Sequence, residues 1–108
     1  PEEAGRLRGD ARRLQELGAF AVVLECIPSA LAAELTHELA IPTIGIGAGR
    51  ETGGQVLVMT DVLGLDASFR PRFARRYADG HAVVLDAVNA YARDVRNARF
   101  PAGTEVPA

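Results

Sequence analysis

The stretch FAVVLECIP, Phe20 to Pro28, decides how this chain folds. Its five consecutive apolar residues predict a buried strand over residues 21–24, and Glu25 follows that strand immediately. Pro28 and Ser29 then predict the start of a helix, because proline suits the first helical turn. The sequence therefore predicts a strand that carries a carboxylate out of the core at its carboxyl end.

Helices are predicted on both sides of this strand. Before it, apolar residues at helical spacing and acidic residues in the first turn predict a helix from about Glu3 to Leu17, with Gly18 as its stop. After it, the helix opened by Ser29 is expected to end before Pro42. The leucines expected on the inner face of the second helix are Leu31, Leu35 and Leu39.

Two more strands are predicted, Thr43–Ile46 and Val56–Met59, joined by the glycine-rich loop Gly47–Gln55. Val, Leu and Ile dominate all three strands without polar alternation, which is typical of parallel strands covered on both faces. The element order predicts right-handed βαβ connections.

The last third of the chain has a helical pattern. Three aromatic residues that step by four predict a short helix over about Pro71–Ala78, broken by Gly80, and a longer helix runs from roughly His81 to Ala98. Residues 101–108 are expected to be a loose tail, after a domain spanning residues 1–100. The aromatic residues are Phe69, Phe73 and Tyr77, and the apolar face of the long helix holds Val84, Leu85, Val88, Tyr91 and Val95.

Composition narrows the class of protein. The chain has 108 residues, 48% of them hydrophobic, which is typical of a globular domain. A net charge of -2 argues against general nucleic-acid binding, and no apolar run is long enough to cross a membrane. The single cysteine and the absence of an apolar leader favour a cytoplasmic protein, and the absence of lysine excludes Schiff-base chemistry on this chain.

Glu25 is the first candidate site residue. Ligands of parallel α/β sheets and of (β/α)8 barrels bind beyond the carboxyl ends of the strands, where a carboxylate can act as a general base. A structural carboxylate, bonded to an arginine or to the amides of the next helix, is an equally good interpretation of the position alone.

The alternating glycines of IPTIGIGAG, residues 41–49, form a second candidate. Gly45 and Gly47 could let the backbone approach a substrate closely, and tight packing at a barrel rim explains the pattern equally well. Arg50 stands where a dinucleotide fingerprint needs its third glycine, so that motif is excluded.

Three other features favour structural interpretations. Cys26 is expected to be a small buried hydrophobe rather than a nucleophile. The arginines among residues 70–76 are expected on a solvated helix face or a subunit contact. Asp61 and Asp66 are expected in turns and caps rather than as metal ligands, and no metal-binding residue is assigned on this chain.

Three stretches together resemble the C-terminal part of the ketopantoate hydroxymethyltransferase family. They are GAFAVVLECIPSALA (18–32), IPTIGIGAG (41–49) and GGQVLVMTDVLGL (53–65), supported by PRFARRYAD (71–79), and the likeness covers residues 1–101. The resemblance implies strands six to eight of a (β/α)8 TIM barrel of the phosphoenolpyruvate/pyruvate type.

The resemblance also implies an activity. The family transfers a hydroxymethyl group from 5,10-methylenetetrahydrofolate to 3-methyl-2-oxobutanoate, with Mg²⁺ bound, giving 2-dehydropantoate for pantothenate synthesis. Its general base maps onto Glu25. Gly53 departs from the aspartate that the family usually carries there, which leaves that aspartate's role open.

The family's metal-binding acids and substrate-binding lysine have no counterpart here, and a barrel needs roughly 200 residues or more. We therefore expect a chain that is inactive alone, with exposed apolar residues, as part of a longer enzyme or of a homo-oligomer. The alternatives are a non-catalytic oligomerising barrel remnant and a 2-oxo-acid carbon-carbon lyase of the same barrel class.

Overall fold

The computed structural model describes residues 2–105, which divide into two compact units after Val58. Unit 1 denotes its residues 2–58 and unit 2 its residues 59–105. Unit 1 contains α1 (Glu2–Glu16), β1 (Val22–Glu25), α2 (Ser29–Glu38), β2 (Thr43–Ile46) and β3 (Gly54–Gln55). Unit 2 contains α3 (Met59–Leu63), α4 (Gly80–Arg96) and a 3-10 turn, η1 (Gly103–Glu105).

The three strands of unit 1 form a parallel sheet in the order β1-β2-β3. The predicted parallel α/β arrangement is therefore confirmed, and the predicted bounds of β2 match the structure. Barrel closure stays a prediction, because the described strands form an open sheet.

The first helix ends as predicted. Gly18 has φ 93°, Gly18 N donates to the Gln15 carbonyl at 3.0 Å, and Ala19 N donates to the Leu14 carbonyl at 3.1 Å. These bonds form a Schellman motif, which needs a residue in the left-handed conformation that glycine adopts at no steric cost. The motif ends α1 and leads the chain into β1.

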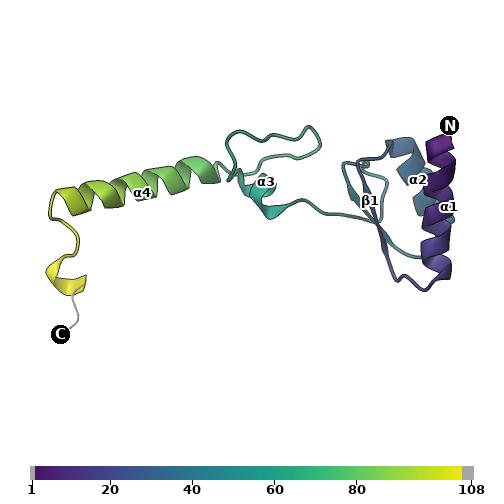
Figure 1. Ribbon diagram of the computed structural model, residues 1–108, viewed down its shortest axis with the longest axis horizontal. Helices are drawn as coiled ribbons and strands as arrows, with labels where there is room; N and C mark the ends of the chain where they lie inside the picture. Colours follow the sequence, from purple (N-terminus) through teal and green to yellow (C-terminus); the bar gives the residue numbers. More distant parts are fainter. Residues whose placement is uncertain (1, 106–108) are drawn as a thin grey trace. The chain divides into compact units, whose positions relative to one another are not determined.

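The core of unit 1 lies between one face of the sheet and the helices α1 and α2, which lie beside β1 in Figure 1. Val22 and Leu24 of β1 point into it, and the predicted leucine face of α2 is confirmed. Fully burying a leucine side chain stabilises a fold by about 1.5–3 kcal/mol. The core residues are Ala11, Val22, Leu24, Leu31, Ala32, Leu35, Leu39 and Ala48.

The opposite face of the sheet is uncovered in the described structure. Val23 is 55% exposed, and Val56 and Val58 beyond β3 are 44% and 52% exposed. The prediction that the strands are covered on both faces is therefore wrong for these residues, because the helices of unit 1 supply a single covering layer. The expectation of exposed apolar residues is met.

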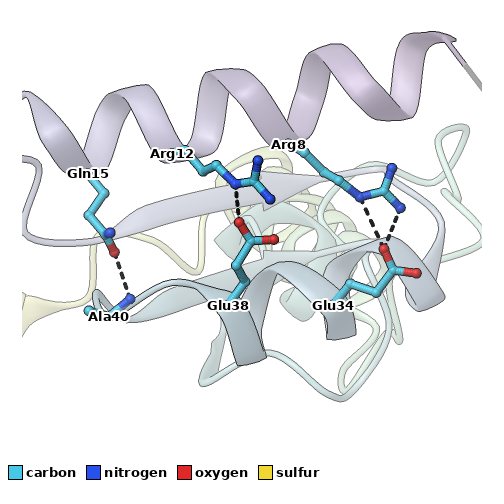
Figure 2. Close-up of polar contacts among 6 residues, drawn as sticks. All are labelled: Arg8, Arg12, Gln15, Glu34, Glu38 and Ala40. Carbon is cyan, nitrogen blue, oxygen red and sulfur yellow. Dashed lines mark hydrogen bonds and ion pairs between the residues drawn. The ribbon is translucent and has the colours of Figure 1, made fainter.

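Helices α1 and α2 run parallel and are joined by polar contacts, which Figure 2 shows. Arg8 pairs with Glu34, and Arg12 pairs with Glu38. The Gln15 amide oxygen accepts a 2.6 Å hydrogen bond from the Ala40 backbone N–H. The residue numbers of the bonded partners increase in the same direction along both helices, as expected for successive helices of a β/α repeat.

The third strand differs from the predicted range Val56–Met59. The structure places β3 at Gly54–Gln55, and Met59 is the first residue of α3. A strand extends only as far as a neighbour can pair with its backbone, and the last such bond runs from Val56 N to the Gly45 carbonyl at 3.0 Å. The apolar run continues past its partner strand.

Unit 2 corrects the predicted short helix. Residues 71–78 form turns and extended loop instead, and residues 65–79 close back on α3 through a 2.8 Å bond from Tyr77 N to the Val62 carbonyl. The long helix is confirmed within two residues at each end, and Gly80, which was predicted to break the short helix before it, is its first residue. Asp79 caps its start by accepting a hydrogen bond from Ala82 N at 3.3 Å.

The end of the described chain has local order. Phe100 packs edge-on against Tyr91, with ring centroids 5.3 Å apart, and η1 follows. Residues 106–108 of the predicted tail lie outside the described residues. None of the helices in residues 2–105 has the length and apolar character that crossing a membrane requires.

Candidate functional site

The three strands of unit 1 end at one edge of the sheet, which we call the carboxyl edge. Its residues are the last of each strand, Glu25, Ile46 and Gln55. Glu25 pairs in register with Ile46 of the central strand. The predicted position of Glu25, at the carboxyl end of a buried strand, is confirmed, whereas its chemical role remains a prediction.

The Glu25 side chain is exposed and points away from the helix-covered face, since β1 alternates buried and exposed residues. Among residues 2–105, none of the four ion pairs involves Glu25. Helix α2 has Pro28 at its N-cap and receives no side-chain capping bond. The described residues thus offer no support for a carboxylate locked to an arginine or to the helix amides.

The residues that directly follow β1 and β2 both have positive φ. Cys26, directly after Glu25, has φ 51°, and Gly47, directly after β2, has φ 63°. The Cys26 N–H donates to the Ile46 carbonyl at 2.8 Å, so the two exits are joined across the ladder. The prediction that Cys26 is buried is wrong, because the left-handed turn carries its side chain to the surface.

The glycine-rich segment is a crossover connection. Residues 47–53 return the chain from the end of β2 to the start of the parallel strand β3, a path that usually takes about a dozen residues or more. A β-carbon on Gly45 would lie 2.5 Å from Thr52 Oγ1, and one on Gly49 would lie 2.6 Å from the Ser29 β-carbon. At Gly45 and Gly49 the missing side chain therefore makes room for the crossover, as the packing interpretation requires.

Hydrogen bonds hold the crossover in place. The Gln55 amide nitrogen donates to the Gly49 carbonyl and to Thr52 Oγ1, both at 2.8 Å. Thr43, which is 1% exposed, accepts a bond from Gly53 N at 3.1 Å and shares a 2.8 Å bond with the Thr36 hydroxyl. Sequence reasoning missed Thr43, although a hydroxyl within an apolar strand is the signal that could have identified it.

Gly53 is tightly enclosed as well. A β-carbon there would lie 3.2 Å from the Thr43 carbonyl oxygen. A larger residue would require its surroundings to move by a few tenths of an ångström, so glycine suits the local packing at this position.

Of the two candidate aspartates, Asp66 lies in a turn as predicted, whereas Asp61 lies within α3. Asp66 Oδ1 accepts bonds from the Ser68 hydroxyl at 2.7 Å and from the Ser68 and Phe69 backbone N–H groups at 2.8 and 3.2 Å. The hydroxyl bond, followed by the two amide bonds, lowers the pKa of Asp66. Residues 2–105 contain no group of three or more His, Cys, Asp or Glu side chains that could hold a metal ion.

The arginine cluster lies on a loop and not on the predicted helix face. Arg76 donates to the Asp66 carbonyl at 2.5 Å, and the Arg75 guanidinium lies 5.9 Å from the Tyr77 ring centroid. These contacts hold the loop to itself. His37 is exposed near the end of α2 and is not at the carboxyl edge.

Comparisons with known proteins agree on one family. A family model described as ketopantoate hydroxymethyltransferase matches residues 1–103. The 3-methyl-2-oxobutanoate hydroxymethyltransferase of Salinibacter ruber is 61% identical over 100 residues, which are 93% of this chain and 38% of that relative. The proteins of the same name from Chlorobaculum tepidum and Chlorobium phaeobacteroides (strain BS1) are each 58% identical over 104 residues, again 38% of their length.

The chain thus spans about two fifths of the length of these curated relatives, while nearly all of it takes part in the match. The family model covers both units, including the strand exits and the crossover. This chain therefore belongs to the ketopantoate hydroxymethyltransferase family.

Proposed function

We propose that this chain is the C-terminal portion of an enzyme that transfers a hydroxymethyl group from 5,10-methylenetetrahydrofolate to 3-methyl-2-oxobutanoate, giving 2-dehydropantoate. In this proposal, β1, β2 and β3 are strands six, seven and eight of a (β/α)8 barrel. The names of the relatives support hydroxymethyl transfer rather than the carbon-carbon lyase alternative.

One observation carries the proposal: Glu25 ends β1 at the carboxyl edge with an exposed carboxylate that is not held in an ion pair within residues 2–105. In barrel enzymes the reaction takes place at this edge. An unengaged carboxylate there can accept a proton from a substrate within hydrogen-bonding reach.

The proposed role of Glu25 is that of general base. It removes the proton from the carbon next to the keto group of 3-methyl-2-oxobutanoate, and the electron pair of that C–H bond forms an enolate. The enolate carbon then attacks the one-carbon unit carried by the folate co-substrate and forms the new carbon-carbon bond. The backbone N–H groups around Gly47, next to Glu25 across the ladder, are proposed to contact the substrate.

Gly45 is a weaker candidate for substrate binding. Thr52 occupies the space that a side chain on Gly45 would need. We therefore propose a supporting role for Gly45, which is to let the crossover approach β2.

Mg²⁺ does not fit the residues described here. The family resemblance implies that ion, yet residues 2–105 contain no cluster of three potential ligands. We therefore propose that its ligands come from the part of the enzyme outside this chain, and we derive no step through the metal. The same reasoning makes the chain inactive by itself.

Two further assignments belong to the proposal. The exposed apolar surfaces favour a homo-oligomeric enzyme, and the exposed free thiol of Cys26 suits the reducing cytoplasm.

The test is Glu25→Gln in the whole protein of which we propose this chain is part. Incubation with 3-methyl-2-oxobutanoate in D2O, without folate, isolates the first step, because only a working base exchanges the substrate proton next to the keto group. We expect the variant to lose about 10²–10⁴-fold in exchange rate and in transfer rate. The exchange is followed by NMR.

The matched control is Glu16→Gln, which removes an exposed carboxylate at the end of α1 and should leave both rates within twofold. If Glu25→Gln exchanges the proton as fast as the unaltered protein, Glu25 is not the base. Turnover by residues 1–108 alone would instead refute the claim that the chain is incomplete.

A second candidate function, a non-catalytic oligomerising module, is favoured by one observation. Helix α4 contains no buried residue, and its predicted apolar face is exposed, with Val84 at 55% and Val88 at 57%. Multi-angle light scattering of the purified chain separates the two: a defined oligomer without ligand supports the module, whereas a heterogeneous, partly unfolded sample supports an incomplete enzyme.

A further inference from the structure

The turn that follows Glu25 uses an unexpected residue. Cys26 has φ 51°, in the left-handed region that side chains disfavour. Four glycines take positive φ elsewhere in the described chain, and besides Cys26 only Ala98 does so with a β-carbon. Glycine would adopt the Cys26 backbone conformation with less steric strain. Backbone preference therefore does not explain why a cysteine occupies this position.

Burial does not explain it either. The Cys26 side chain is exposed and is not part of the core cluster of unit 1. The backbone of Cys26 is nevertheless tied to the sheet, because its N–H donates to the Ile46 carbonyl at 2.8 Å. Ile46 immediately precedes Gly47, so this bond joins both strand exits at the point where Glu25 leaves the ladder.

A β-carbon restricts the range of backbone angles that a residue can adopt in a left-handed turn. Residues with side chains reach only a small basin near φ 50–70°, whereas glycine spreads over a much wider range of positive φ. A turn built on Cys26 therefore holds the preceding residue in a narrower range of directions than the same turn built on glycine. A base whose direction is fixed in advance needs less reorganisation to reach a substrate proton.

We propose that Cys26 is a positioning residue, whose β-carbon confines the left-handed exit turn and thereby aims the Glu25 carboxylate. The thiol has no part in this role. The inference rests on the proposed function, in which Glu25 is the base, and it adds to that function the element that orients the base.

The test compares Cys26→Gly with Cys26→Ala in the whole protein. Alanine keeps the β-carbon and removes the thiol, so we expect kcat and KM within twofold of the unaltered enzyme. Glycine removes the β-carbon, so we expect kcat and the proton exchange rate in D2O to fall about tenfold, with KM within twofold. The Tm of Cys26→Gly should equal or exceed that of the unaltered protein, because glycine relieves the left-handed strain.

The split between a retained Tm and a reduced kcat is the decisive readout, since a merely structural residue would not lower kcat while preserving stability. Unchanged kcat in Cys26→Gly overturns the proposal. Equal losses in Cys26→Ala and Cys26→Gly overturn it too, because they assign the effect to the thiol.

Amide hydrogen exchange separates this proposal from the proposed function. The Cys26 N–H should exchange about tenfold faster in Cys26→Gly than in Cys26→Ala, whatever reaction the protein catalyses. If the unaltered protein transfers no hydroxymethyl group, the proposed function fails. If this amide exchanges equally fast in the two variants, the proposal that the β-carbon confines the turn is wrong.

Discussion

Unit 1 and unit 2 have similar amounts of helix but bury their apolar residues very differently. Unit 1 packs two helices on one face of its sheet around a core that contains Leu35 at 1% exposure. Among residues 59–105, Gly64 alone is buried, and Leu85 on the apolar face of α4 is 49% exposed. An amphipathic helix derives most of its stability from packing, so unit 2 has helix-forming sequence without the packing that stabilises it.

The largest expected effect comes from removing leucine side chains in the two units. Leu35→Ala should reduce the free energy of unfolding by about 2–5 kcal/mol, because it leaves a cavity in the core of unit 1. Leu85→Ala should change the free energy of unfolding by less than about 0.5 kcal/mol, because Leu85 is exposed. Urea unfolding followed by far-ultraviolet circular dichroism measures both. Equal losses would mean that the apolar face of α4 is buried in solution.

Glycines provide the next contrast. Gly49→Ala should reduce the free energy of unfolding by about 1–3 kcal/mol, since the new β-carbon would lie 2.6 Å from that of Ser29 and φ is 85°. In unit 2, the new β-carbon of Gly103→Ala would lie in open space. This variant should change the free energy of unfolding by less than about 0.5 kcal/mol. Thermal unfolding of the two variants tests the comparison. A harmless Gly49→Ala would show that the crossover does not pack against α2.

Buried and exposed threonines should differ by a similar amount. Thr43→Val keeps the shape of the side chain but leaves Gly53 N without its acceptor, which should cost about 1–3 kcal/mol. Thr60→Val, at an exposed position in unit 2, should cost less than about 0.5 kcal/mol. Exchange of the Gly53 amide gives a local readout, and unchanged protection in Thr43→Val would rule out the threonine as the anchor.

The smallest expected effect is electrostatic. The bond from Arg12 lowers the pKa of Glu38 from its usual value near 4.5, so the pair contributes stability above that pH and loses it as the pH falls through the lowered pKa. Glu38→Gln should therefore be slightly less stable than the unaltered chain at pH 7 and equally stable at strongly acidic pH. Urea midpoints measured across this range should show the difference, and added salt should reduce it.

Asp66→Asn is the counterpart in unit 2. The hydrogen bond from the Ser68 hydroxyl lowers the pKa of Asp66. As for Glu38, the ionised carboxylate therefore stabilises the structure at higher pH, and this contribution is lost as the pH falls through the lowered pKa. Its effect should remain local to the loop, visible as faster exchange of the Ser68 amide above the pKa. A change in the urea midpoint of unit 1 would show that the effect is not confined to the loop.

The sequence predicted most of unit 1 because its helices and first two strands pair with or pack on neighbours inside the same unit. The inner leucines of α2 and the bounds of β2 follow from local pattern for that reason. Val56–Met59 was wrong because an apolar run becomes a strand only where a partner strand exists, and β2 offers partners only to Gly54 and Gln55. The register of a sheet edge depends on residues distant in sequence.

The aromatic residues of unit 2 show the other limit. Phe69, Phe73 and Tyr77 have helical spacing, yet their exposed fractions are 58%, 43% and 67% and the segment is a loop. Helical spacing predicts a helix only if a surface exists for the apolar face to cover. At the candidate site, the location of Glu25 followed from strand polarity. The positive φ of Cys26 had no sequence pattern of its own, and the anchoring by Thr43 was marked only by a hydroxyl within an apolar strand.

The helix-free crossover also bears on the order in which the sheet assembles. The β2–β3 pair Ile44 and Gly54 is 54 − 44 = 10 residues apart, while the β1–β2 pair Val22 and Thr43 is 43 − 22 = 21 residues apart. Doubling the length of a flexible loop adds about 0.6 kcal/mol to the entropic cost of closing it. We therefore expect the glycine-rich side of the sheet to close first during refolding, and the strand that carries the proposed base to join afterwards.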